Sequence, residues 1–251
     1  MKISIITVCY NSAKTIKQAI KSVLSQTYSN IEYIVIDGGS TDGTLEIINK
    51  YRDKIAKFVS EPDKGIYDAM NKGLKLATGD IIGILNSDDF YTDEFVLEKV
   101  AKKFEETNSD CLWGDLVYVD RNNIGKIIRF WKSSEYREGK FKMGWHPPHP
   151  TFFARKEIYN KYGLFNLNFK IAADIEIMLR FLEKFKISSA YIPEILIKMR
   201  TGGTSAKNIK NIIKANVETY RAWKVNGLKI NPLWVLLKPL SKVLQLIKSV
   251  K

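Results

Sequence analysis

An apolar run that ends in two adjacent carboxylates constrains this chain more than any other feature. Residues 81–85 read Ile-Ile-Gly-Ile-Leu, and Asn-Ser-Asp-Asp follows at 86–89. A short run this rich in isoleucine predicts a fully buried strand, and open α/β sheets bind ligands beyond the ends of such strands. Two adjacent carboxylates there need a positive partner, for which a divalent metal holding a diphosphate is the obvious choice. The alternative is that the polar residues only cap the next helix.

Strand-like and helix-like segments alternate along the first 90 residues. Apolar strand-like runs begin at Lys2, Ile31, Lys57 and Ile81, and apolar residues at helical spacing occupy about 12–26, 44–51 and 66–77. This β-α-β-α order predicts a parallel, doubly wound sheet. A length of 251 residues fits one large α/β domain or two small ones.

A glycine-rich turn follows the second predicted strand rather than the first. Residues 38–43 read Gly-Gly-Ser-Thr-Asp-Gly and lack the GxGxxG spacing, which disfavours a classical dinucleotide-binding fold. Asp37 ends the strand before this turn, and its carboxylate could accept a hydrogen bond from an imide N–H or a ribose hydroxyl. Turn chemistry alone is the alternative explanation for Asp37.

The positive charge is concentrated near the C-terminus. Residues 205–251 hold ten basic residues and one acidic residue, so they carry +9 of the net charge of +13. Such a tail seeks phosphates on nucleic acid or on anionic lipid. Residues 232–251 form a basic amphipathic pattern with Trp234, which fits a membrane interface. Packing on the domain or on a partner subunit explains this pattern equally well.

The cysteines and the N-terminus indicate the cellular compartment. Cys9 and Cys111 lie in apolar runs, and the sequence has no CxxC or Cys/His cluster, which disfavours zinc and disulfides and fits a reducing compartment. The apolar stretch at 3–8 is too short for a signal peptide. No window reaches the roughly 18 apolar residues of a spanning helix. We therefore expect a cytoplasmic protein, with peripheral attachment to the inner face of the membrane as an option.

Four motifs in the first 90 residues, in this order and spacing, resemble the family 2 glycosyltransferases. They are Thr7-Val-Cys-Tyr-Asn11, Ile36-Asp-Gly-Gly-Ser-Thr-Asp-Gly-Thr44, Asn71-Lys-Gly-Leu with Ala77-Thr-Gly-Asp80, and Leu85-Asn-Ser-Asp-Asp89. The resemblance implies an α/β fold of the GT-A type: a mostly parallel, doubly wound sheet, a smaller acceptor-side sheet and C-terminal helices. We expect a catalytic domain at 1–204, with a nucleotide-sugar half at 1–90 and an acceptor half at 91–204, then a basic helical tail at 205–251.

The resemblance also assigns roles at the donor side. It implies that Val8 and Tyr10 line the base, largely through backbone and ring. Asp37 would read the base, which is usually uracil in the family, and Lys72 would lie near the nucleotide. Asp88 would face the ribose or the donor sugar. A nucleotide-sugar donor is therefore the expected ligand.

The same resemblance implies a metal ligand and a general base. Asp89 would bind Mn²⁺ or Mg²⁺, and diphosphate oxygens and water would complete the coordination. Asp174 would activate the acceptor hydroxyl, although the family has a Glu-Asp pair where this chain has Ala173-Asp174; the alternative is an Asp that complements the helix dipole. Possible acceptor or diphosphate contacts are His149, in a rigid Pro-rich segment, and Arg200 and Ser205, which flank a Gly-Gly pair.

The resemblance thus implies an inverting glycosyltransferase that moves a sugar from a nucleotide-diphosphate sugar, with UDP expected, to a hydroxyl acceptor. The basic tail suggests a lipid-linked glycan intermediate of surface polysaccharide synthesis as the acceptor. One alternative is a catalytically inactive nucleotide-sugar-binding protein of the same fold. The other is a basic nucleic-acid-binding protein. We expect no nucleic-acid partner, because the charge is concentrated in an amphipathic tail while the predicted core has acidic strand ends.

Overall fold

The computed structural model describes residues 1–202 and 209–231, and the strands within these ranges form one nine-stranded sheet. The strands are β1 (Ile3–Cys9), β2 (Ile31–Asp37), β3 (Lys57–Ser60), β4 (Ile81–Asn86), β5 (Asp89–Tyr91), β6 (Cys111–Val119), β7 (Ile127–Trp131), β8 (Phe153–Arg155) and β9 (Ser189–Arg200). Their order across the sheet is β3-β2-β1-β4-β8-β6-β9-β5, and β7 branches from β6.

The strand directions confirm the mostly parallel α/β fold. The strands β3, β2, β1 and β4 pair in parallel, and so do β6 and β9. The strand β8 is antiparallel to both of its neighbours, and β5 and β7 are antiparallel edge strands. The expected smaller sheet is not separate. Its strands continue the main sheet because the long β6 pairs first with β8, through Cys111 and Leu112, and then with β7, from Leu116 onward.

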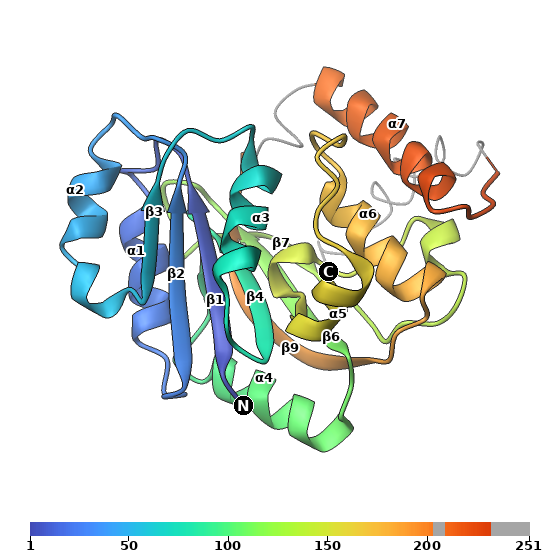
Figure 1. The fold of residues 1–251 in the computed structure, drawn as a ribbon, viewed down its shortest axis with the longest axis horizontal. Helices are drawn as coiled ribbons and strands as arrows, with labels where there is room; N and C mark the ends of the chain where they lie inside the picture. Colours follow the sequence, from blue (N-terminus) through green and yellow to red (C-terminus); the bar gives the residue numbers. More distant parts are fainter. Residues whose placement is uncertain (203–208, 232–251) are drawn as a thin grey trace.

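Helices cover both faces of the sheet (Figure 1). They are α1 (Ile16–Leu24), α2 (Thr44–Asn49), α3 (Ile66–Leu76), α4 (Val96–Thr107), α5 (Lys156–Tyr162), α6 (Ala173–Leu179), which a π-helical turn extends (Arg180–Lys184), and α7 (Ile209–Val225). Side chains alternate along each strand, so Ile5 packs in the core with α1 and α4, while Ile6 packs in the core with α3 and α6. A Cβ at Gly73 would lie 2.4 Å from Ile6 Cγ2, so this glycine allows α3 to approach β1 closely.

The predicted C-terminal helical segment is present as α7, which packs on α6 (Figure 1). Its Ala222 and Trp223 are buried in the same core as α3 and α6. The amphipathic segment 232–251 lies outside the described residues. Among the helices in the described ranges, none has the length and apolar character needed to cross a bilayer.

Candidate active site

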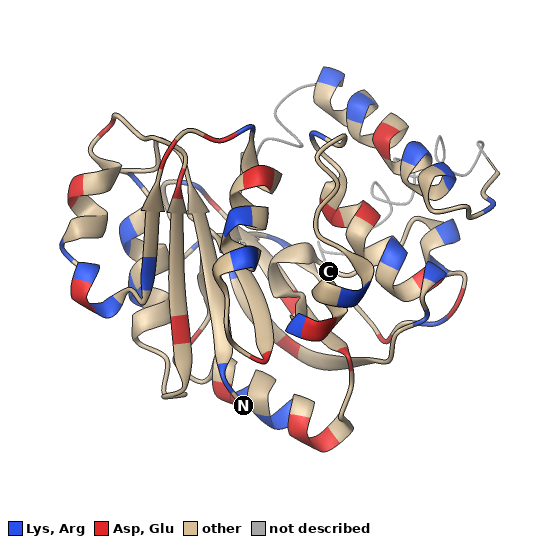
Figure 2. Ribbon diagram, in the orientation of Figure 1, with Lys and Arg blue, Asp and Glu red and all other residues tan. Residues whose placement is uncertain are grey.

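The loops after β1, β2 and β4 meet at one edge of the sheet. The register pairs Cys9 with Asp37 and Val8 with Asn86, so these three strands end side by side. Figure 2 shows acidic positions in the loops beyond the arrowheads of β2 and β3. The sequence motifs that were expected to bind the donor are therefore brought together at this edge.

Asp37 is fully buried, and its own loop and the neighbouring strands supply its hydrogen bonds. Its Oδ2 accepts the N–H groups of Gly39 and Ser40 at 3.0 and 2.9 Å and the hydroxyl of Ser60 at 2.8 Å, and its Oδ1 accepts the Ser40 hydroxyl at 2.5 Å. Burial acts to raise the pKa of Asp37, but these donors outweigh it and the pKa falls below its ordinary value. Asp37 thus shapes the turn, and its predicted contact with the base stays a prediction.

A second carboxylate, Asp63, lies directly over this turn. A Cβ on Gly38 would lie 2.4 Å from Asp63 Oδ2 and 3.4 Å from the Tyr10 ring, so Gly38 leaves room for both side chains. Tyr10 is 63% exposed, whereas Val8 is buried. Asp63 was not among the predicted site residues. The available signal was a turn-forming Pro-Asp-Lys-Gly stretch that follows a strand ending at the same edge.

Lys72 is engaged with the loop that carries Asp63. Its Nζ lies 2.8 Å from Glu61 Oε1 and 3.9 Å from Asp68 Oδ2, and it donates to the Pro62 carbonyl at 3.0 Å. The hydrogen bond from Lys72 to Glu61 is the largest of the effects that raise the pKa of Lys72. Lys72 therefore fixes the position of this loop, and direct contact with the nucleotide stays a prediction.

The two carboxylates after β4 have different environments. Asp88 is half-buried, whereas Asp89 is 0% exposed. Asp89 Oδ2 accepts the Asn86 amide N–H at 3.1 Å, but Asp89 Oδ1 and Asn86 Oδ1 are buried without a hydrogen-bond partner. Burial first, and then the charge of Asp88, raise the pKa of Asp89 well above its ordinary value. Among the predicted site residues, Asp89 is thus a carboxylate with a buried oxygen that has no hydrogen-bond partner.

Arg200, at the end of β9, lies within electrostatic reach of both carboxylates. Its Nη1 donates to the Asp88 carbonyl oxygen at 2.6 Å, and its Nη2 donates to Gln18 Oε1. The guanidinium carbon lies 5.1 Å from the centre of the Phe90 ring. Because Arg200 is buried and holds protein groups, it ties β9 and α1 to the carboxylate loop. Its predicted contact with acceptor or diphosphate stays a prediction.

The predicted base Asp174 lies in the first turn of α6 and is half-buried. The Tyr67 hydroxyl, from α3, lies 3.1 Å from Asp174 Oδ1 and 2.7 Å from the Ile171 carbonyl oxygen. His149 is buried with its ring at 5.7 Å from the Phe165 ring, and burial lowers the pKa of this imidazole although Asp174 acts in the opposite direction. A neutral His149 and a hydrogen-bonded Asp174 therefore share one region.

The loop before α6 is held by a carboxylate from α7, which the sequence analysis did not foresee. Glu218 is buried and accepts the backbone N–H groups of Lys170, Ile171 and Ala172 at 3.1, 2.8 and 2.9 Å. These N–H groups lie just before the first turn of α6, and an acidic group near the N-terminus of a helix is favourable. Glu218 thereby fixes the loop that leads into Asp174.

Tyr118, on β6, interacts electrostatically with both the predicted metal ligand Asp89 and the predicted base Asp174. Burial is the main cause that raises the pKa of its hydroxyl, and the charges of both Asp89 and Asp174 raise it further. Its ring is therefore within electrostatic reach of the predicted metal ligand and of the predicted base. Trp131 stacks on the same ring, with the ring centres 6.4 Å apart and the planes 3° from parallel.

The described residues fit a cation whose remaining ligands come from the substrate. They contain no group of three or more His, Cys, Asp or Glu side chains arranged to hold a metal. The buried and unpartnered oxygens of Asp89 and Asn86 are nevertheless the hard donors that Mg²⁺ and Mn²⁺ prefer. Ser205 lies outside the described residues.

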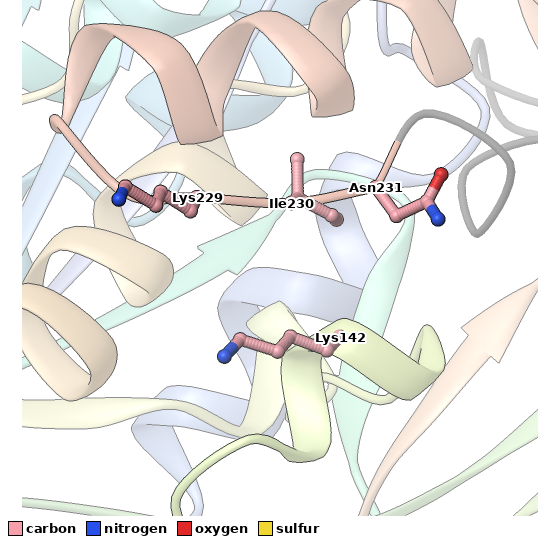
Figure 3. Close-up of a pocket in the computed structure, with 4 residues that line it drawn as sticks. All are labelled: Lys142, Lys229, Ile230 and Asn231. Carbon is pink, nitrogen blue, oxygen red and sulfur yellow. The ribbon is translucent and has the colours of Figure 1, made fainter.

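A hollow of about 420 Å³ lies elsewhere, between the short 3₁₀ turn at Lys140–Met143 and the chain after α7. Its lining residues are Lys142, Lys229, Ile230 and Asn231 (Figure 3). None of the predicted site residues lines it, so this hollow is not the candidate active site.

Known proteins include clear relatives of this chain. Residues 4–163 match the model of glycosyl transferase family 2. An uncharacterized glycosyltransferase from Mycobacterium tuberculosis is 34% identical over 184 residues, which cover 71% of this chain and 68% of the relative.

Two solved structures share the fold. S. aureus TarS 1–349 in complex with UDP-GlcNAc is 21% identical, with a TM-score of 0.71 and coverage of 94% of this chain and 69% of that one. The mannosyltransferase PcManGT from Pyrobaculum calidifontis, in complex with GDP-Man and Mn²⁺, is 18% identical, with a TM-score of 0.64 and coverage of 88% and 64%. These similarities confirm the predicted GT-A type of fold. The chain belongs to glycosyl transferase family 2.

Proposed function

We propose that this glycosyltransferase moves a sugar from a UDP-sugar to a hydroxyl of a lipid-linked glycan, with inversion at the anomeric carbon. The observation that carries the proposal is the pairing of two carboxylate centres around Tyr118: the unsatisfied Asp89 on one side and the hydrogen-bonded Asp174 on the other. A donor held at one centre and a base at the other is the arrangement that a direct displacement needs.

The donor side would bind the nucleotide in the loops after β1 and β2. The exposed Tyr10 ring offers a face on which a base can stack. The Asp63 carboxylate beside it can accept the imide N–H of uracil, since an ionised carboxylate only accepts hydrogen bonds. Asp37 and Lys72 keep these two side chains in place. The UDP-GlcNAc bound by TarS is consistent with a uridine donor.

Asp89, with Asn86 and Asp88 beside it, would hold Mn²⁺ or Mg²⁺. A cation there would neutralise the negative charge that develops on the departing diphosphate. The Mn²⁺ in the PcManGT complex supports a metal in this fold. Until the cation binds, the Arg200 charge is the one that offsets the carboxylate pair.

Asp174 would take the proton of the acceptor hydroxyl. As that oxygen forms its bond to the anomeric carbon, the bond from this carbon to the diphosphate oxygen breaks on the opposite face. The Tyr67 hydroxyl lies within hydrogen-bonding distance of Asp174 Oδ1, so Asp174 Oδ2 would be the oxygen that accepts the proton. The neutral His149 nearby adds no positive charge that would weaken this base.

The first test is a screen of UDP-, GDP- and TDP-sugars for protection against thermal unfolding, with and without Mn²⁺. A donor well above its dissociation constant should stabilise the protein by about 2–4 kcal/mol, and we expect this only for UDP-sugars with the metal. Stabilisation by GDP- or TDP-sugars instead would contradict the assigned nucleotide.

The second test is transfer by Asp174→Asn, measured on a membrane extract or synthetic polyprenyl-linked acceptor. Removal of a general base typically lowers the rate 10²–10⁴-fold. The shift in unfolding temperature that the donor gives should stay within twofold of the wild-type shift. Asn168→Ala, an exposed change in the loop before α6, is the control. Donor binding without transfer in the wild type would favour the inactive binding protein over the enzyme.

A further inference from the structure

The turn and the outer strand of the β6–β7 hairpin, together residues 120–132, present large apolar side chains to solvent. Among the described strands β7 pairs with β6 alone, so its other edge has no described strand beside it. An apolar strand edge attracts a partner unless it is covered or charged. The exposed apolar residues are Ile124 (37% exposed), Ile127 (58%), Ile128 (46%) and Phe130 (42%).

Positive charge is interleaved with these apolar side chains. Residues 121–132 contain four basic residues and no acidic residue. Three of the four are exposed and one is half-buried. They are Arg121, Lys126, Arg129 and Lys132. The hairpin therefore combines an apolar surface with a basic one over only twelve residues.

Charge complementarity selects the partner. A second copy of the chain would bring an identical set of four positive charges to the same edge, and like charges opposite each other destabilise strand pairing. The segment 232–251 of the chain has four lysines and no acidic residue, so it would be repelled as well. A partner that is apolar inside and negative at its surface satisfies both properties of the hairpin, and an anionic lipid bilayer has this composition.

The paired part of the hairpin lies beside the proposed active site. Tyr118 of β6 is paired in register with Arg129 of β7, whose guanidinium carbon lies 5.2 Å from the centre of the Tyr118 ring. Trp131 stacks on Tyr118, which is within electrostatic reach of Asp89 and Asp174. At the tip, Arg121 donates to the Thr201 carbonyl oxygen at 3.4 Å, next to the end of β9. A surface that holds this hairpin would therefore lie beside the acceptor side of the site.

We propose that the β6–β7 hairpin is a membrane-contacting element that docks the protein on anionic lipid headgroups and inserts its apolar side chains among them. This inference rests on the proposed function in one respect, since a lipid-linked acceptor gives the docking its purpose. It is independent of the segment 232–251. The hairpin brings the membrane to Tyr118, and the acceptor reaches Asp174 from the bilayer surface.

The test is sedimentation of the full chain with vesicles of phosphatidylcholine alone or with 30% phosphatidylglycerol, at 0.1 M salt. We expect binding to the anionic vesicles and weak binding to the neutral ones. Ile127→Thr with Ile128→Thr keeps β-branched side chains, and it should weaken binding at least tenfold because apolar burial is lost. Lys126→Gln with Lys132→Gln should weaken it about fivefold for each charge.

The matched control is Ile213→Ala with Val217→Ala, which removes a comparable pair of exposed apolar side chains from α7. We expect this variant to bind within twofold of wild type. Vesicle binding that survives both hairpin changes, or no binding by the wild type, would overturn the proposal. So would a wild-type dimer in sedimentation velocity that the Ile127/Ile128 variant dissociates, because the hairpin would then join two copies.

Donor protection separates this inference from the proposed function. The hairpin variants should keep the thermal shift given by UDP-sugars and Mn²⁺, which shows that they are folded and that the donor site is intact. Loss of the shift in the wild type would reject the proposed donor while the vesicle result stands. Loss of the thermal shift in a hairpin variant, but not in the wild type, would show that the hairpin is needed for donor binding and would contradict its separate role in membrane docking.

Discussion

Two buried carboxylates lie toward opposite ends of the same sheet and have opposite environments. Glu32, 4% exposed, accepts hydrogen bonds from the Ser4 hydroxyl at 2.6 Å and the Thr78 N–H at 2.7 Å, and Lys2 and Lys57 lie 3.3 and 3.4 Å from its Oε1. Burial acts to raise its pKa, but these partners outweigh burial and lower the pKa from 4.5 to about 2.

Asp89 is buried as deeply but lacks such partners. One of its oxygens accepts a single amide N–H, from Asn86, and the other has no hydrogen-bond partner. Burial and the charge of Asp88 raise its pKa well above the ordinary value. Glu32 therefore stabilises the ionised fold, whereas Asp89 costs stability in the absence of a ligand. A buried carboxylate with all its hydrogen bonds, such as Glu32, stabilises the fold. A buried carboxylate without them at the carboxyl ends of the strands, such as Asp89, indicates a place where a ligand supplies the missing partner.

The largest expected difference between the two residues is in activity. Asp89→Asn should lower kcat/KM by about 10²–10³-fold, the size seen when one transition-state charge stabiliser is removed. Glu32→Gln should leave kcat/KM within threefold, because its partners hold the amino ends of the strands. Sugar transfer is measured for both below their unfolding temperatures. Comparable losses in the two variants would show that Asp89 is structural as well.

The next difference is in stability. Glu32→Gln should lower the free energy of unfolding at pH 7 by about 3 kcal/mol, since the pKa shift of the wild-type residue is a stability term of that size. Urea denaturation followed by circular dichroism measures this value. Glu105→Gln, an exposed helical position on α4, is the control and should change it by less than 0.5 kcal/mol, as is usual for surface changes.

The acid dependence of stability gives the sign of each shift. The contribution of Glu32 is present above its unfolded pKa and is lost as the pH falls from about 4.5 to about 2, so Glu32→Gln should flatten that part of the curve. The pKa of Asp89 is raised in the folded state, so its effect on the pH dependence of stability has the opposite sign. The cost of Asp89 is absent below its unfolded pKa of about 4 and grows as the pH rises above it, so Asp89→Asn should flatten the curve above pH 4.

The two residues also differ in how far the sequence predicts them. The apolar run at 81–85 and the carboxylates after it were sufficient to predict β4 and a site at its end, because strand pattern and loop position are local properties. The turn around Asp63 could be predicted, but its position over Gly38 could not, and neither could the position of Glu218 at the start of α6. Each depends on segments that are distant in sequence and meet only in the folded chain. The continuity of the sheet was missed for the same reason, since β6 changes partners along its length.

Glu218 is a third buried carboxylate, satisfied like Glu32 but placed beside the site like Asp89. Glu218→Gln keeps the shape of the side chain and removes the charge that the three N–H groups of the α6 loop point to. A hydrogen bond to a charged group is worth about 1.5–3 kcal/mol, so we expect kcat to fall about 10- to 30-fold. Thermal protection by a UDP-sugar should stay within twofold of wild type. Thr219→Val, on the same helix, is the control, and an equal loss of kcat there would mean that α7 acts only through general packing.

The smallest expected effect is a gain in stability. Asp89→Asn should raise the free energy of unfolding at pH 7 by about 1 kcal/mol without ligand, because the buried charge is removed while one polar atom is still left without a partner. With UDP-sugar and Mn²⁺ the order should reverse, since the wild type gains about 2–4 kcal/mol from a ligand that the variant binds poorly. Asp88→Asn, at the half-buried neighbour, should show a smaller gain because water already solvates that carboxylate. A variant that is destabilised both with and without ligand would place Asp89 with Glu32, as a residue that the fold itself requires.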